Sequence, residues 1–123
     1  VICWDADFPN VIQQAGQQDV DLLFVPSNDW YEVRDIHAGM ATFRAAENGM
    51  ALFRQTGQGV SLVTDARGQV LNRVDMFEEQ ATGFTGMQRV EVPLGSVDTL
   101  YTSVGDWFGV AMLMGLVGLL AAL

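Results

Sequence analysis

An almost unbroken apolar run from Asp21 to Val25 constrains the fold of this chain more than any other feature. Its sequence, Asp-Leu-Leu-Phe-Val, lacks the alternation of a strand with one wet face, and Pro26 ends it. Such a run is expected where a strand is covered on both faces. A shorter apolar run, Val1 to Cys3, comes before it, and the residues from Pro9 to about Gln17 favour a helix that begins with proline. The sequence therefore predicts a strand, helix, strand unit and an α/β fold.

A second helix is predicted from about Glu32 to Asn48. Ile36, Met40 and Phe43 recur there at helical spacing. Gly49 follows at the place where a helix commonly ends in the left-handed conformation.

The rest of the first hundred residues predicts strands joined by turns. Glycines at 57 and 59 and the turn Asp-Ala-Arg-Gly at 65–68 divide three apolar runs into a meander, and a less regular stretch at 75–86 precedes a last strand that Pro93 ends. The predicted strands are Met50 to Thr56, Val60 to Thr64, Gln69 to Val74 and Met87 to Val92.

The C-terminal tail differs in composition from everything before it. From Trp107 to Leu123 it contains no charged or strongly polar side chain. It is somewhat short, since about 20 apolar residues normally cross a bilayer, but Trp107 suits an interfacial anchor. Three glycines would weaken a helix in water more than in lipid. We therefore predict one domain over residues 1–104 and a transmembrane helix over 105–123, with a buried C-terminal helix as the alternative.

Charge and residue types exclude several functions. The net charge is −9, and the six basic residues are all scattered arginines, which argues against a nucleic-acid partner. Without lysine, the chain itself supplies no Schiff base and no P-loop phosphate contact. The single cysteine rules out an intrachain disulfide.

Cys3 is the candidate nucleophile, because it ends an apolar run and faces a turn into a helix. Position alone favours a buried structural cysteine instead. His37 is expected to be a hydrogen-bonded structural residue rather than the partner of a Cys-His pair. One cysteine and one histidine make no metal site, so we expect neither metal nor other cofactor.

Four segments, taken in order, resemble the nitrilase or carbon-nitrogen hydrolase superfamily. They are Val-Ile-Cys-Trp-Asp at 1–5, Val-Pro-Ser-Asn-Asp-Trp at 25–30, Arg-Ala-Ala-Glu-Asn-Gly at 44–49 and Thr-Gly-Gln-Gly-Val-Ser at 56–61. Within the superfamily the likeness is strongest to the apolipoprotein N-acyltransferases, because their nitrilase-like domain is followed by a returning membrane helix, as the apolar tail suggests here.

The resemblance implies the C-terminal half of an α-β-β-α sandwich and a catalytic Glu-Lys-Cys set, of which only Cys3 has a counterpart here. Trp4 and Asp5 stand where the acyltransferases commonly have Tyr-Glu. The loop formed by Ser27, Asn28, Asp29 and Trp30 is expected to line the pocket. The resemblance also implies that Arg44 and Glu47 form a buried structural pair, although their spacing alone fits a surface pair.

The implied function of the intact protein is acyl transfer at a membrane. It would move a fatty acyl group from phospholipid, through a cysteine thioester, to the N-terminal amine of a lipoprotein, on the periplasmic side of the bacterial inner membrane. The fragment alone is expected to be inactive, because it lacks the glutamate and lysine, and to self-associate through an uncovered sheet face. The alternatives are an amidase of the same superfamily and a non-catalytic membrane-anchored binding module.

Overall fold

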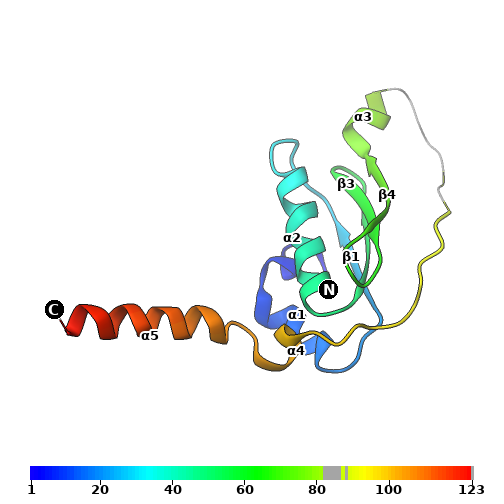
Figure 1. Cartoon of the computed structure of the whole chain (residues 1–123). Helices are drawn as coiled ribbons and strands as arrows, with labels where there is room; N and C mark the ends of the chain where they lie inside the picture. The colour runs from blue at the N-terminus through cyan, green and yellow to red at the C-terminus, as the bar shows by residue number, and fades with distance from the viewer. Residues whose placement is uncertain (82–86, 88, 123) are drawn as a thin grey trace.

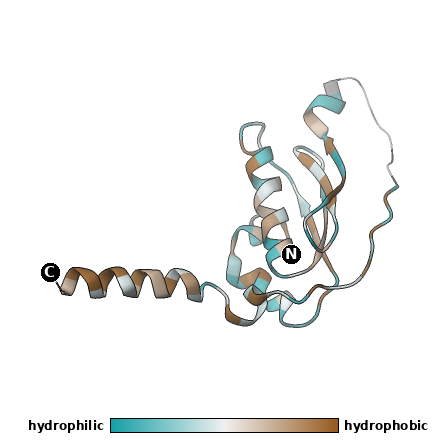
Figure 2. Cartoon of the chain, viewed as in Figure 1, coloured by the Kyte–Doolittle hydropathy of each residue, from teal (hydrophilic) through white to brown (hydrophobic). Residues whose placement is uncertain are grey.

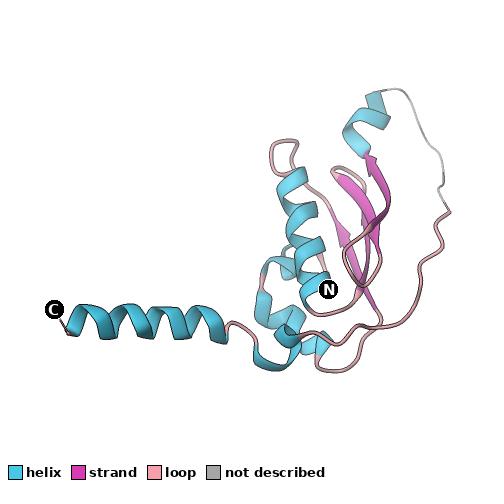
Figure 3. Ribbon diagram, in the orientation of Figure 1, coloured by secondary structure: helices cyan, strands magenta, loops and turns pink. Residues whose placement is uncertain are grey.

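The computed structural model describes residues 1–81, 87 and 89–122. They form one short four-stranded sheet with helices packed on one side and a separate C-terminal helix (Figures 1 and 3). The helices are the 3-10 helix η1 (Cys3–Asp7) and the α-helices α1 (Pro9–Gly16), α2 (Arg34–Glu47), α3 (Met76–Ala81), α4 (Leu100–Val104) and α5 (Trp107–Ala121). The strands are β1 (Leu22–Ser27), β2 (Ala51–Thr56), β3 (Val60–Thr64) and β4 (Val70–Asp75).

The sheet has the strand order β1-β2-β3-β4. β1 and β2 are parallel because the chain returns through α2, with Phe24 opposite Phe53. β2, β3 and β4 are antiparallel neighbours joined by short turns, and the register between β3 and β4 shifts at Val63 and Thr64. The α/β fold class predicted from the sequence is therefore confirmed.

One face of the sheet packs against α1 and α2 and holds the hydrophobic core. Alternate strand residues point to this face, as the pleat of a strand requires. From α2 the core receives three buried alanines, and small side chains allow a helix to approach a sheet closely. The core cluster includes Ile12, Leu23, Val25, Ala38, Ala41, Ala45, Met50, Leu52, Val60 and Leu62.

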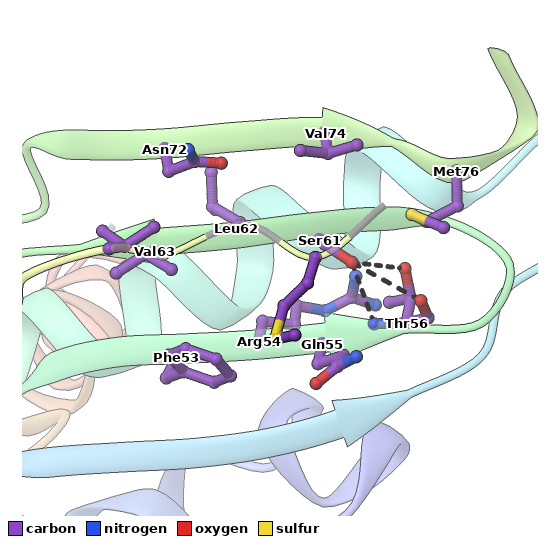
Figure 4. A pocket seen from close by; sticks show the side chains of 12 residues that line it. Phe53, Arg54, Gln55, Thr56, Ser61, Leu62, Val63, Asn72, Val74 and Met76 are labelled. Carbon is purple, nitrogen blue, oxygen red and sulfur yellow. Dashed lines mark hydrogen bonds between the residues drawn. The ribbon is translucent and has the colours of Figure 1, made fainter. Parts of the chain in front are cut away.

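The opposite face of the sheet is largely open. Phe24 and Phe53 stack there with ring centroids 5.3 Å apart, and half of the Phe24 surface is exposed. Figure 4 shows the hollow over this face, where Ser61 and Thr56 are joined by hydrogen bonds across β2 and β3. This face lacks a packed layer of helices among the described residues (Figure 3).

Three predicted segments differ in the structure. The predicted strand Val1 to Cys3 is wrong, because a φ of 45° at Cys3 breaks the extended chain, although the Val1 amino group still donates to the Phe24 carbonyl of β1. The described residues of the predicted strand Met87 to Val92 form no strand; Met87 and Val90 line the hollow instead. Residues 76–81, expected to be irregular, form α3, and the carboxylate of Asp75 accepts the Phe77 N-H at its start.

The apolar spacing on α2 predicts the helix correctly but not its inner face. Ile36 is 62% exposed and Phe43 is 72% exposed, so these large side chains point away from the core. Ala38, Ala41 and Ala45 form the buried stripe.

Gly49 ends α2 as predicted, with a φ of 68°. The N-H groups of Gly49 and Met50 bond to the carbonyls of Ala46 and Ala45, the pattern of a Schellman motif. A Cβ atom on Gly49 would lie 1.8 Å from the carbonyl oxygen of Val97, whose own N-H bonds to the Gly49 carbonyl at 2.9 Å. Gly49 therefore serves both the helix end and a close approach of the later chain.

That later chain, residues 96–102, is fastened to the helix layer, and we call it the strap. Besides the bond from Val97, the Ser96 N-H donates to Asp21 Oδ1 at 2.9 Å and the Thr99 hydroxyl donates to the Glu47 carbonyl at 2.5 Å. The amide of Gln13 on α1 donates to the Tyr101 carbonyl. The strap thus fixes the point from which the C-terminal residues leave the domain.

Beyond the strap, α5 projects away from the domain (Figure 1), and Figure 2 shows that it is hydrophobic along its length. Every described residue of α5 is exposed. The prediction of a helix in this region is confirmed. The prediction that residues 105–123 form a transmembrane helix is not confirmed, because no helix among the described residues is both long and apolar enough to cross a membrane.

The double role of Gly49 gives a test of the fold. We expect Gly49→Ala to lower the free energy of unfolding by about 2 kcal/mol or more, since an alanine is strained at positive φ and its methyl group would push the strap away. The matched control is Gly39→Ala within α2, where a Cβ meets nothing within 4 Å. It should be neutral or stabilise by up to about 1 kcal/mol. Urea denaturation measures both; equal effects would contradict this account.

Candidate active site

The candidate site is built on the turn that carries Cys3. Cys3 opens η1 with a φ of 45°, a left-handed conformation that non-glycine residues rarely adopt. The turn is closed locally, because the Ile2 N-H donates to the Asp5 carboxylate at 2.8 Å and the Asp5 N-H donates to the Ile2 carbonyl at 3.0 Å. A strained turn of this kind costs on the order of 1–3 kcal/mol and persists only where its surroundings hold it.

The thiol of Cys3 faces the loop that follows β1. Its sulfur lies 3.7 Å from the carbonyl oxygen of Asn28, and the side chain is half-buried. Asn28 is itself fixed to the β2–β3 turn, because its Oδ1 accepts the Gln58 N-H at 2.7 Å. The Asp29 N-H donates back to the Gln58 carbonyl at 2.9 Å. The structure thus brings together Cys3 and Asn28, a residue of the loop that the resemblance implies lines the pocket.

Asp29 turns inward and forms an ion pair with Arg54 of β2. Arg54 Nη2 donates to both carboxylate oxygens, at 2.7 and 3.0 Å, and its Nη1 donates to the Val60 carbonyl at 2.6 Å. Arg54 is 2% exposed and Asp29 is 6% exposed. A buried charge pair is tolerated only when its hydrogen bonds are complete, and here they tie the loop to two strands.

His37 of α2 joins the same network. Its Nδ1 lies 3.1 Å from Asp29 Oδ1, and its Nε2 lies 3.8 Å from a carboxylate oxygen of Asp7. The Trp4 ring meets the imidazole edge to face, with centroids 5.3 Å apart. The expectation of a hydrogen-bonded structural histidine is confirmed.

The other predicted pocket residues lie around this centre but make fewer contacts with the rest of the site. Trp4 and Trp30 are both largely exposed, and the Ser27 hydroxyl donates to the carbonyl of Val25 at 3.4 Å. Asp5 uses its carboxylate to cap the Cys3 turn. The part each plays toward a substrate stays a prediction.

Arg44 and Glu47 form an ion pair at the far end of α2, about two turns from His37. Their side chains are 22% and 23% exposed, which is intermediate between the surface pair and the buried pair weighed from the sequence. Burial raises the pKa of Glu47, and the charge of Arg44 opposes that rise. The Glu47 carbonyl accepts the Thr99 hydroxyl, so the pair lies beside the strap rather than beside Cys3.

Arg54 is the site residue that sequence reasoning missed. The signal was its parity in β2: Leu52, two residues earlier, points into the core, so the arginine must point inward too. A buried arginine in a small domain needs a buried carboxylate. Chemically, the arrangement presents a thiol on a rigid turn, while the imidazole nearby faces two carboxylates.

Similar sequences occur among the curated bacterial apolipoprotein N-acyltransferases. No family model matches the chain. It is 32% identical over 110 residues to the apolipoprotein N-acyltransferase of Vibrio vulnificus, an alignment that covers 86% of this chain and 21% of that protein. It is 30% identical over 121 residues to apolipoprotein N-acyltransferase 2 of Treponema denticola, covering 94% of this chain and 22% of that protein. The chain thus spans about a fifth of the length of these curated relatives.

Similar solved structures come from the nitrilase superfamily. A variant of the Nesterenkonia amidase from that superfamily superposes with a TM-score of 0.56 at 24% identity, covering 62% of this chain and 32% of the other. A second variant of that amidase, which carries a covalently added acetamide moiety at its active-site cysteine, gives a TM-score of 0.54 at 25% identity over the same shares. The resemblance to the nitrilase superfamily and to the apolipoprotein N-acyltransferases is therefore confirmed.

The buried pair generates a stability prediction. We expect Arg54→Met to lower the free energy of unfolding by about 3–5 kcal/mol, because the Asp29 charge would stay buried without its main partner. The control is Arg73→Met, which removes the exposed pair with Asp35 and should cost no more than about 1 kcal/mol. Urea unfolding of both variants decides the matter, and a small loss for Arg54→Met would show that the pair is not desolvated as described.

Proposed function

We propose that the complete protein containing this chain transfers a fatty acyl group from phospholipid to the N-terminal amine of a lipoprotein, with Cys3 as the acyl carrier. The observation that carries the proposal is the Cys3 turn: a half-buried thiol at a strained φ, facing the loop at 28–30, in a chain similar to apolipoprotein N-acyltransferases. Nucleophiles are commonly presented on such sharp turns, where the sulfur is accessible and nearby N-H groups can face an oxyanion.

Two displacement steps at Cys3 account for the reaction. The sulfur attacks the ester carbonyl of the phospholipid, so a carbon-sulfur bond forms, the ester carbon-oxygen bond breaks, and the lysophospholipid alkoxide leaves with a proton. The lipoprotein amine then attacks the thioester, so an amide bond forms, the carbon-sulfur bond breaks, and the thiol regains a proton. Splitting the transfer in this way replaces one difficult step by two easier ones.

We propose that the base and the oxyanion donor come from outside this chain. It contains no lysine, and its one imidazole is engaged by Asp29 and Asp7. A thiol without a base and an oxyanion donor is a poor acyl acceptor. We therefore propose that the chain alone is inactive, that it takes no cofactor, and that Trp4, Asp5, Ser27 and Trp30 contribute to substrate binding in the complete protein.

Attachment to a membrane is the second element of the proposal. All described side chains of α5 are exposed and none is charged, so in water this helix would leave a large apolar surface uncovered. Lipid removes that cost, and Trp107 at its start suits the interface. We place the domain at the bacterial inner membrane, on the periplasmic side, where lipid donor and lipoprotein acceptor would meet.

An amidase acting on a small amide is the second candidate, because the structurally similar proteins are amidases and one holds an acetamide moiety on its cysteine. Product analysis separates the two candidates. Acyl transfer yields an N-acylated lipopeptide and lysophospholipid, whereas amide hydrolysis yields free acid and ammonia. A non-catalytic membrane-anchored module would yield neither.

Replacing the nucleophile tests the proposal directly. In the complete protein we expect Cys3→Ala to abolish both the thioester and the acylated product, while the wild type shows a mass increase of one acyl chain on the peptide containing Cys3. Intact and peptide mass spectrometry after incubation with phospholipid vesicles measures this. The matched control is Ser61→Ala on the open sheet face, remote in sequence and hydrogen-bonded to Thr56. Unchanged transfer by Cys3→Ala would refute a cysteine carrier, whereas the absence of product from the wild type would favour the binding module.

The open sheet face makes a further prediction about the isolated chain. We expect it to self-associate, because the half-exposed Phe24 and its partner Phe53 form an apolar surface without a covering layer. Phe24→Asp should reduce association measured by light scattering with α5 held in detergent. Phe43→Asp, which alters an exposed aromatic ring on α2, is the control. A monodisperse wild-type monomer at high concentration would contradict this expectation.

A further inference from the structure

We infer that His37 is a positioning residue for Cys3, because one imidazole ring ties together the two segments that meet at the cysteine sulfur. This inference rests on the proposed function, since it assigns a role toward the chemistry of Cys3. His37 touches neither the sulfur nor any group proposed to react, and its effect runs through Asp29, Asp7 and Trp4.

The first segment held by His37 is the loop after β1. The imidazole Nδ1 lies 3.1 Å from Asp29 Oδ1, and Asp29 directly follows Asn28, whose carbonyl oxygen is 3.7 Å from the Cys3 sulfur. A carboxylate bonded to Arg54 only accepts hydrogen bonds, so the Nδ1 atom must carry the proton. This fixes both the tautomer and the plane of the ring.

The second segment is η1, which begins with Cys3 itself. Trp4, the next residue, packs edge to face on the imidazole, and Asp7 at the end of η1 faces Nε2 at 3.8 Å. Since Nδ1 already donates to Asp29, the other side of the ring is left to meet η1. His37 therefore contacts residues on both sides of the contact between the Cys3 sulfur and the Asn28 carbonyl.

The strained φ at Cys3 explains why such a clamp is needed. A left-handed cysteine turn is held only when contacts around it outweigh its intrinsic cost. The local bonds between Ile2 and Asp5 close the turn but do not fix it relative to the loop. The imidazole supplies that link, and its side chain is only 15% exposed, so packing keeps it in place.

A positioning role predicts a loss of rate rather than of substrate affinity. Displacing a reacting atom by about 1 Å can slow a reaction by about a hundredfold. Loosening η1 should therefore slow acylation of Cys3, while binding of the lipid donor elsewhere is kept.

The test uses His37→Asn in the complete protein. An asparagine Nδ2 can replace Nδ1 as the donor to Asp29, so the fold is retained, whereas the ring that contacts Trp4 and Asp7 is lost. The control is Phe43→Ala, which removes an exposed aromatic ring from the same helix without touching η1. Hydrogen exchange of the peptide covering residues 1–8 is measured together with the rate of Cys3 acylation by vesicles of phosphatidylethanolamine and phosphatidylglycerol.

For His37→Asn we expect exchange in residues 1–8 to be about tenfold faster, with β2 and β3 still protected. Acylation at saturating lipid should slow by about 10- to 100-fold, with KM for the vesicles changed less than about twofold. Phe43→Ala should match the wild type in both assays. Unchanged exchange, or faster exchange with an unchanged acylation rate, would overturn the positioning role.

A failure of the acyl-transfer proposal can be told apart from a failure of the role of His37. If wild-type Cys3 is not acylated by lipid, the acyl-transfer proposal fails. Alkylation of Cys3 by iodoacetamide, which needs no lipid, then decides the role of His37. It should be faster in His37→Asn, because the freed turn exposes the half-buried sulfur. An equal alkylation rate in the variant and the wild type would overturn the inference on its own.

Discussion

Arg54 and Asp29 lie almost wholly out of contact with water, and the hydrogen bonds that Arg54 donates to Asp29 and to the Val60 carbonyl connect a loop to two strands of the sheet. Two charges removed from solvent cannot drift apart without a large desolvation cost, so the loop is held in one conformation. Asp29 also accepts from His37, and Asn28 beside it faces the Cys3 sulfur. The geometry around the thiol therefore depends on an interaction buried behind it, which fastens a short irregular loop to the sheet.

Much of the fold could be predicted because single residues and short turns determine where helices and strands end. Gly49 sets the end of α2, and the turn at 65–68 separates two strands that both occur. α3 was missed although Asp75 followed by Glu78 and Glu79 is a helix-start pattern, because the segment has no apolar periodicity. The inner face of α2 could not be predicted from the same spacing, for a related reason. Periodicity shows that a helix exists, but alanines pack closest to a sheet and leave the larger side chains outside.

Some residues of the candidate site could likewise be predicted from the sequence, and others could not. Cys3 and the loop at 28–30 were chosen as candidates from the sequence, because the motifs that resemble the nitrilase superfamily mark them. The partner of Asp29 was not, since Arg54 lies 25 residues further along the chain and only strand parity hints at its direction. A contact between the imidazole and both Asp7 and Trp4 depends on how α2 crosses η1, and no pattern in one sequence encodes that crossing.

The strap determines where a force on α5 enters the domain. Its hydrogen bonds end on Gln13, Glu47 and Gly49 and on Asp21, the residue before β1, and α5 begins only a few residues later. Any pull on α5 is therefore shared between the helices and the start of β1. The thiol faces Asn28, which follows the opposite end of β1, so a tethered domain can swing about its anchor while the load enters the fold away from the cysteine turn.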